Sequence, residues 1–259
     1  RGKLLWTPST LSGFEARLSY HHFESKGGYI FSYLDASAPD YFDNRINPSD
    51  YPNSSDVDND QVTLDLRYDL GGGLSLSALG TWTDTDFIRK YDGDFSPAST
   101  AYSDIAGGAK TFTQELRLNY ESDRLSGLAG LFYYNRDQYR RAHQVTLVPT
   151  PGPTIASLLT PALGAQTAAQ VASLYTAALP IIPVDYRSNF PTQVETMAVF
   201  ADARYRLTER LSLLGGFRYD RERNKIGGGA IATFVGTLPD PAAYGQLAAA
   251  FAGVNAAVP

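Results

Sequence analysis

The sequence predicts an all-β fold, an antiparallel meander of about eight strands that forms part of a transmembrane β-barrel. Three observations predict it. Apolar and polar residues alternate with a period of two in three hairpin-like units, short turns alternate with long loops, and aromatic residues recur at both ends of the apolar segments. A period of two belongs to strands that have one apolar and one polar face.

The composition limits the class of protein. Of 259 residues, 43% are hydrophobic and 19% are charged. No stretch approaches the roughly 20 consecutive apolar residues that a membrane-spanning helix needs. Barrel strands expose only alternate residues to lipid, so this polarity still permits a membrane protein. A net charge of -5 argues against nucleic-acid binding, and the absence of cysteine removes disulfides and thiolate metal sites.

The predicted strands follow from the alternation and from the turns between them. The clearest unit is 62–70, the triglycine 71–73 and the returning strand 74–82, and similar units cover 115–133 and 200–219. Each returning arm begins its apolar face with Leu and carries an aromatic residue eight positions later, about 26 Å along a strand, which suits the apolar band of an outer-membrane barrel. The strands are expected near residues 2–7, 14–24, 60–70, 74–88, 110–121, 125–138, 193–207 and 211–224.

Aromatic residues mark both ends of these apolar faces. One group lies just before the short turns, and the other lies at the far end of the returning arms. Outer-membrane barrels carry aromatic girdles at both membrane interfaces. The predicted girdle consists of Trp6, Tyr68, Trp82, Tyr120, Tyr133, Tyr205 and Tyr219.

Short and long connections alternate without exception. The short turns are 8–13, 71–73, 121–124 and 208–210. The long ones are 25–59, a loop of about 20 residues, and a stretch of over 50 residues in which 160–178 is expected to form a short helix. Outer-membrane barrels show this asymmetry, with short periplasmic turns and long extracellular loops. A soluble sandwich has no reason to keep it. The sequence therefore predicts part of a β-barrel in the outer membrane of a Gram-negative cell.

Four predicted strands place an acid two residues before an arginine. Residues two apart share a strand face, and each pair lies opposite the apolar face, so all are predicted to face the lumen. They would guide a solute or contact an internal plug. Alternatively, they form a ladder of mutually satisfied charges that a polar wall needs whatever the cargo. The pairs are Glu15/Arg17, Asp65/Arg67, Glu115/Arg117 and Asp202/Arg204.

No catalytic, metal or cofactor site is predicted, and the protein is not expected to be an enzyme. The acidic run 56–60 resembles a calcium loop but lacks the Gly and the distant Glu of an EF-hand, so a solvated loop edge is expected. His21 and His22 point to opposite strand faces, and His143 is isolated. Spacing supports neither a Ser-His-Asp arrangement nor a phosphate-binding loop.

The predicted strands resemble the β-barrel domain of TonB-dependent outer-membrane receptors, especially the branch abundant in sphingomonads. Five stretches carry the resemblance, among them FTQELRL at 112–118 and VFADARYRLTERLS at 199–212. These are signatures of the barrel and do not indicate a substrate. The other three stretches are 1–9, 127–134 and 215–222.

The resemblance implies that residues 1–259 are a partial barrel without the plug, the TonB box or the C-terminal strand. The implied partners are outer-membrane lipid, the plug domain of the parent chain, the TonB complex and a small-molecule ligand. The implied function is TonB-energised uptake of a scarce solute such as a ferric siderophore or a similar iron chelate. A passive porin-type barrel and a soluble β-sandwich binding module are the alternatives. With two open edges, this piece alone is expected neither to transport nor to stay soluble.

Overall fold

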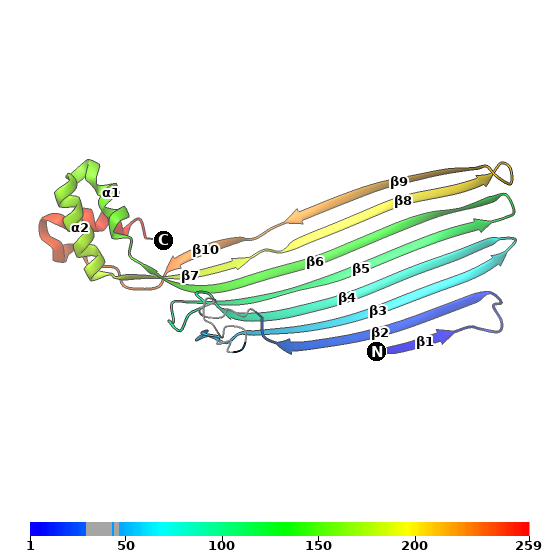
Figure 1. Ribbon diagram of the computed structural model, residues 1–259, viewed down its shortest axis with the longest axis horizontal. Helices are drawn as coiled ribbons and strands as arrows, with labels where there is room; N and C mark the ends of the chain where they lie inside the picture. Colours follow the sequence, from blue (N-terminus) through cyan, green and yellow to red (C-terminus); the bar gives the residue numbers. More distant parts are fainter. Residues whose placement is uncertain (30–42, 44–46, 259) are drawn as a thin grey trace.

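One antiparallel sheet dominates the computed structural model, which describes residues 1–29, 43 and 47–258 (Figure 1). Tight turns lie at one end of the sheet, and the long connections lie at the other. The strands are β1 (Gly2–Trp6), β2 (Phe14–Gly27), β3 (Ser54–Gly71), β4 (Leu74–Asp92), β5 (Ala101–Glu121), β6 (Leu125–Pro149), β7 (Ile181–Asn189), β8 (Thr192–Arg206), β9 (Ser212–Ile226) and β10 (Gly229–Phe234).

Two of the long strands are each divided into two segments. On β6, Arg141 pairs with Asn189 of β7 and Gln138 pairs with Thr192 of β8. Three residues along β6 therefore correspond to three residues along the returning chain, and the register is unchanged across the interruption. In the same way β10 pairs with β7 and β9 pairs with β8 without a change of register. The ten segments thus form the predicted meander of about eight strands.

Pro191 and Gly228 explain where these strands are interrupted. Proline has no backbone N–H to donate to a ladder. Gly228 has a φ of 86°, and a Cβ placed on it would lie 1.8 Å from the backbone oxygen of Asn189. Gly227 N donates to Pro191 O at 2.9 Å, which links the two interruptions.

The strands extend further toward the long loops than predicted. β3 begins at Ser54, β5 begins at Ala101 and β6 ends at Pro149. The acidic run 56–60 therefore lies within β3, and the expectation of a loop edge is wrong. Its residues pair in register with both β2 and β4, so their backbone groups are satisfied although the side chains are polar.

One face of the sheet is apolar and exposed. Leu64, Leu131, Leu213 and Phe217 are 42%, 55%, 58% and 63% exposed. All described strands belong to one sheet, so no second described sheet covers this face. A patch of this extent marks contact with a membrane or another protein. The arrangement does not have the buried interface that defines a soluble sandwich.

A helical lobe lies at the long-loop end of the sheet (Figure 1). In place of the single helix predicted at 160–178, this region has two helices, and the first of them begins before residue 160. Gly164 separates them with a φ of 76°, a conformation that glycine adopts without strain. None of the described helices is long and apolar enough to span a membrane. The lobe comprises α1 (Gly152–Leu163), α2 (Ala165–Ala178), η1 (Pro241–Leu247) and α3 (Ala248–Asn255).

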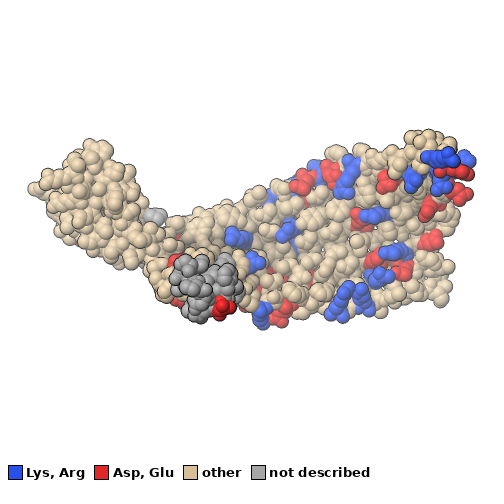
Figure 2. Space-filling view, viewed as in Figure 1, with Lys and Arg blue, Asp and Glu red and all other residues tan. Residues whose placement is uncertain are grey.

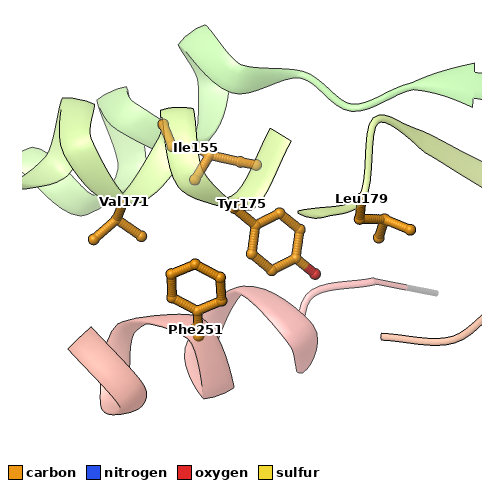
Figure 3. Close-up of a cluster of buried hydrophobic side chains, with 6 residues drawn as sticks. Ile155, Val171, Tyr175, Leu179 and Phe251 are labelled. Atoms are coloured by element: carbon orange, nitrogen blue, oxygen red, sulfur yellow. The ribbon is translucent and has the colours of Figure 1, made fainter. Parts of the chain in front are cut away.

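The lobe has the one cluster of buried apolar residues found in the described part of the chain (Figure 3). Tyr175 of α2 and Phe251 of α3 are fully buried, with ring centroids 5.4 Å apart. Tyr175 Oη donates to Asn255 Oδ1 at 2.8 Å, and Asn255 Nδ2 donates to Pro239 O at 2.9 Å. Two segments far apart in the sequence therefore pack against each other.

Asp94 organises the connection between β4 and β5. Its carboxylate accepts hydrogen bonds from Ser96 N at 2.9 Å, Thr100 N at 3.1 Å and Ala101 N at 2.9 Å, and also from Thr100 Oγ1. The bonds from Ser96 and Thr100 lower the pKa of Asp94 to about 2.

We expect Asp94→Asn to loosen this connection. Hydrogen bonds to a charged acceptor are stronger than those to a neutral amide, so protection of the amides of residues 96, 100 and 101 should fall roughly tenfold at neutral pH. Because the folded pKa is depressed, this stabilisation is present above the ordinary value of about 3.9 and is lost as the pH falls toward 2. Hydrogen exchange corrected for intrinsic rates measures it. Asp123→Asn at the opposite end is the control, and equal protection in wild type and Asp94→Asn would contradict the prediction.

Candidate functional site: the polar face of the sheet

Three of the four predicted acid–arginine pairs form ion pairs on the polar face. Arg17 Nη2 lies 2.9 Å from Glu15 Oε1, and Arg67 Nη2 lies 3.3 Å from Asp65 Oδ2. The third is the pair of Arg117 Nε and Glu115 Oε1, at 2.5 Å. Residues two apart on a strand lie on the same face, so the spacing brings these groups together.

The register aligns these pairs in two adjacent rows across the sheet. One row contains the cross-strand partners Glu15 and Arg67, then Ser77 and Arg117. The next contains Arg17 and Asp65, then Leu79 and Glu115. Acids and arginines alternate both along and across β2 and β3, so each charge has opposite charges as neighbours. Figure 2 shows mixed acidic and basic residues over the sheet, and neither kind over the helical lobe on this side.

A hollow of about 780 Å³ lies over these rows, toward the short turns. Five of the eight predicted charged residues line it, and Arg17 lines a neighbouring hollow of about 470 Å³. Asp202 and Arg204 line neither of them. The five are Glu15, Asp65, Arg67, Glu115 and Arg117.

The fourth predicted pair does not form an ion pair in the described structure. Arg204 Nη2 instead donates to Ser212 Oγ at 3.5 Å, a weak contact. The sequence interpretation missed a different pair, Arg218 and Asp220, whose Nη2 and Oδ1 lie 2.7 Å apart. The same spacing with the arginine first was the signal that could have found it.

Arg218 also connects the charged rows to aromatic rings. Its guanidinium lies 5.6 Å from the ring centroid of Phe132 and 5.5 Å from that of Phe200, and Arg117 lies 6.0 Å from Phe200. Arg218 is the cross-strand partner of Phe200, so it belongs to the row of Arg117. Cations over aromatic faces gain about 0.5–1 kcal/mol at exposed sites. The polar face thus combines fixed charges with flat apolar surface.

The predicted girdle residues lie in two rows on the apolar face. Near the short turns, the ring centroids of Trp6 and Phe14 lie 5.7 Å apart, and those of Phe14 and Tyr68 lie 6.0 Å apart. Tyr120 and Tyr205 share this end through the pairing of β5, β6 and β8. The far row holds Trp82, Tyr133 and Tyr219, together with Phe112, the partner of Trp82, which the sequence interpretation missed.

His22 joins two acids just beyond the far aromatic row. Its Nδ1 lies 3.1 Å from Asp60 Oδ1, which also accepts a hydrogen bond from Tyr20 Oη at 2.6 Å. Ligand atoms of His22, Asp58 and Asp60 all lie within 4.8 Å of one another. As predicted, His21 and His22 alternate on β2 and face opposite sides. The contacts with Tyr20 and His22 both engage the same oxygen of Asp60. We assign no metal site to these residues.

A single-layer meander with an exposed apolar face, two aromatic rows and a charged opposite face has the architecture of a wall of a membrane β-barrel. The family described as TonB dependent receptor-like, beta-barrel, matches residues 6–250. The chain therefore belongs to this family of receptor barrels.

The solved structure of a receptor barrel shows a similar fold. The ferric yersiniabactin uptake receptor FyuA from Yersinia pestis is 15% identical with a TM-score of 0.59, over 89% of this chain and 32% of that one. The siderophore receptor PiuA from Acinetobacter baumannii is 11% identical with a TM-score of 0.35, over 87% of this chain and 38% of that one. The chain thus spans about a third of the length of these receptors. No curated protein matches the sequence significantly.

Proposed function

We propose that the chain is part of the wall of an outer-membrane receptor that takes up a ferric siderophore or a similar iron chelate, energised by the TonB complex. The observation that carries the proposal is the exposed apolar face between two aromatic rows, with a charged face behind it. Membership of the receptor family supports it. The similarity to FyuA, at 15% identity, supports the fold.

In this proposal the apolar face contacts lipid and the two aromatic rows form the membrane girdle. The short turns face the periplasm, and the helical lobe faces the outside of the cell. The acid–arginine rows and Arg218 then line the lumen, where they meet the solute or the plug domain of the parent chain. Ferric chelates are often anionic and contain flat conjugated groups, and guanidinium groups beside aromatic rings suit both features.

Uptake by the full-length receptor tests the function. Cells that carry the full-length gene should accumulate a ferric siderophore under iron limitation, and deletion of the gene or of TonB should abolish accumulation. Uptake that persists without TonB would indicate the passive porin-type barrel instead. Absence of the protein from the outer-membrane fraction would contradict the whole proposal.

The polar face can be tested with a paired variant. We expect Arg117→Gln with Arg218→Gln to weaken chelate binding roughly tenfold, because two charge-assisted contacts to an anion are removed. Arg124→Gln with Arg210→Gln is the matched control, since it removes two positive charges at the short turns. Binding is measured by titration of the purified full-length receptor. Equal affinities in the two variants would show that the charges of the rows neutralise one another and do not bind the chelate.

A further inference from the structure

An apolar hollow of about 500 Å³ lies on the apolar face, over β5, β6, β8 and β9. Leu116, Leu131, Met197 and Val199 form its floor and sides. All four side chains are exposed to a substantial degree, so no described residue fills the hollow. Its far end, toward the long loops, is bordered by aromatic rings and then by a cation. These bordering residues are Tyr133, Tyr219 and Arg221.

Beyond this hollow, β9 carries three successive cations on the same face. Arg221, Arg223 and Lys225 are two residues apart, so they extend about 13 Å along the strand. None of the three forms an ion pair with any residue in the described part of the chain. Glu195 is the cross-strand partner of Arg223, but these two side chains do not form an ion pair either. Lys225 Nζ donates to Gln193 Oε1 at 3.2 Å. Elsewhere on the sheet, arginines such as Arg117 pair with an acid two residues away.

A second hollow, of about 450 Å³, lies beside these cations where the strands are interrupted. Several polar side chains border it, although the surface that lines it is mainly apolar, like that of the first hollow. The two hollows follow one another from the apolar band toward the long loops, with Arg221 bordering the first and Lys225 the second. Among its polar lining residues are Lys110, Asp137, Tyr139, Gln193 and Lys225.

We propose that this surface binds a phosphorylated glycolipid of the outer leaflet. An acyl chain would occupy the first hollow, phosphate would contact Arg221, Arg223 and Lys225, and sugar hydroxyls would contact the polar side chains that border the second hollow. The inference rests on the proposed function, because only that orientation brings the long-loop end of the apolar face to the outer leaflet. Unpaired cations at the edge of an apolar band attract anionic head groups, and arginine forms bidentate bonds with phosphate.

The charges along one cross-strand row favour the β9 side of the sheet over the side of β3 and β4. The cross-strand row of Lys225 continues through Gln193, Asp137 and Lys110 to Asp84 and Asp60. In this row β3 and β4 therefore present acids, which repel phosphate, whereas β9 presents Lys225.

Retention of lipid A by the full-length receptor tests the proposal. The receptor is reconstituted in phosphatidylcholine vesicles that contain a minor fraction of diphosphoryl lipid A, extracted in mild detergent, and analysed by native mass spectrometry. We expect R221Q/R223Q/K225Q to retain roughly tenfold less lipid A than wild type. R124Q/R206Q/R210Q removes the same charge at the short-turn end and should retain as much as wild type. Met197→Phe, which fills the apolar hollow without changing charge, should also lower retention.

Three outcomes would overturn the inference: equal retention by wild type and R221Q/R223Q/K225Q, equal loss in both triple variants, or equal displacement of lipid A by phosphatidylglycerol. The last would show that phosphate without sugar is sufficient. Chelate uptake measured with the same proteins separates this inference from the proposed function. If the wild-type receptor takes up the chelate and R221Q/R223Q/K225Q retains as much lipid A as wild type, the lipid site alone is rejected. If the wild-type protein does not enter vesicles, both the lipid site and the proposed function are rejected.

Discussion

Gly73→Ala is expected to destabilise the β3–β4 hairpin much more than Gly72→Ala, one residue away. Gly73 has a φ of 81°, and a Cβ placed on it would lie 1.9 Å from the backbone oxygen of Glu121. Gly72 has a φ of 63° and no atom within 4 Å of such a Cβ. Both variants incur a left-handed backbone penalty of about 1–2 kcal/mol. The Gly73 variant must also displace β5.

This displacement affects a hydrogen bond between neighbouring hairpins. Glu121 N donates to Gly73 O at 2.8 Å, and its loss costs about 1 kcal/mol in addition to the steric strain. We expect Gly73→Ala to lower the free energy of unfolding by about 3 kcal/mol more than Gly72→Ala. Urea titration of the full-length protein in vesicles, followed by heat-modifiable electrophoretic mobility, measures the difference. Equal midpoints for the two variants would contradict the close approach.

The meander could be predicted because its signals are local. Leu74, Ala78 and Trp82 lie on one face simply because they are an even number of residues apart, and the triglycine fixes the turn before them. The same alternation placed Glu115 and Arg117 on the opposite face. These conclusions need the geometry of a single strand and no knowledge of its neighbours.

The extensions of the strands could not be predicted in the same way. The acidic run 56–60 has no apolar alternation, and it is a strand because β2 and β4 pair with it on both sides. The lobe is equally non-local, since α2 and α3 supply Tyr175 and Phe251 to one core from two segments far apart in the sequence. The residue pattern within a segment does not show which distant segment it pairs with or packs against.

The site residues that were not predicted can likewise be divided into those with a local signal in the sequence and those that depend on distant segments. Arg218 and Asp220 have the spacing of the predicted pairs in reversed order, so the pattern of an acid followed by an arginine does not include them. The cations at 221–225 are visible in the sequence, but their face, their level and the hollow beside them depend on the register of β8 and β9.

Tyr175→Ala is expected to unfold the helical lobe while the sheet remains folded. The core of the lobe has six buried residues, of which Tyr175 is the largest together with Phe251. Removing a buried aromatic side chain costs about 3–5 kcal/mol. A core this small offers little stability in excess of that, and the variant also removes the hydrogen bond to Asn255. The sheet is held by its own ladder, and its contact with this core is through the partly buried Ile182 of β7 and Phe234 of β10.

Hydrogen exchange of the full-length protein distinguishes a cooperative lobe from two independent loops. If the lobe is cooperative, Tyr175→Ala should remove protection from 152–178 and 241–255 together and leave β4 and β5 unchanged. Leu158→Ala is the control, because Leu158 is 73% exposed on α1 and its loss should change stability by less than about 0.5 kcal/mol. Persistent protection of 241–255 in Tyr175→Ala would show that α3 folds without α2. Joint loss would mean that two segments far apart in the sequence unfold as one cooperative unit at the long-loop end.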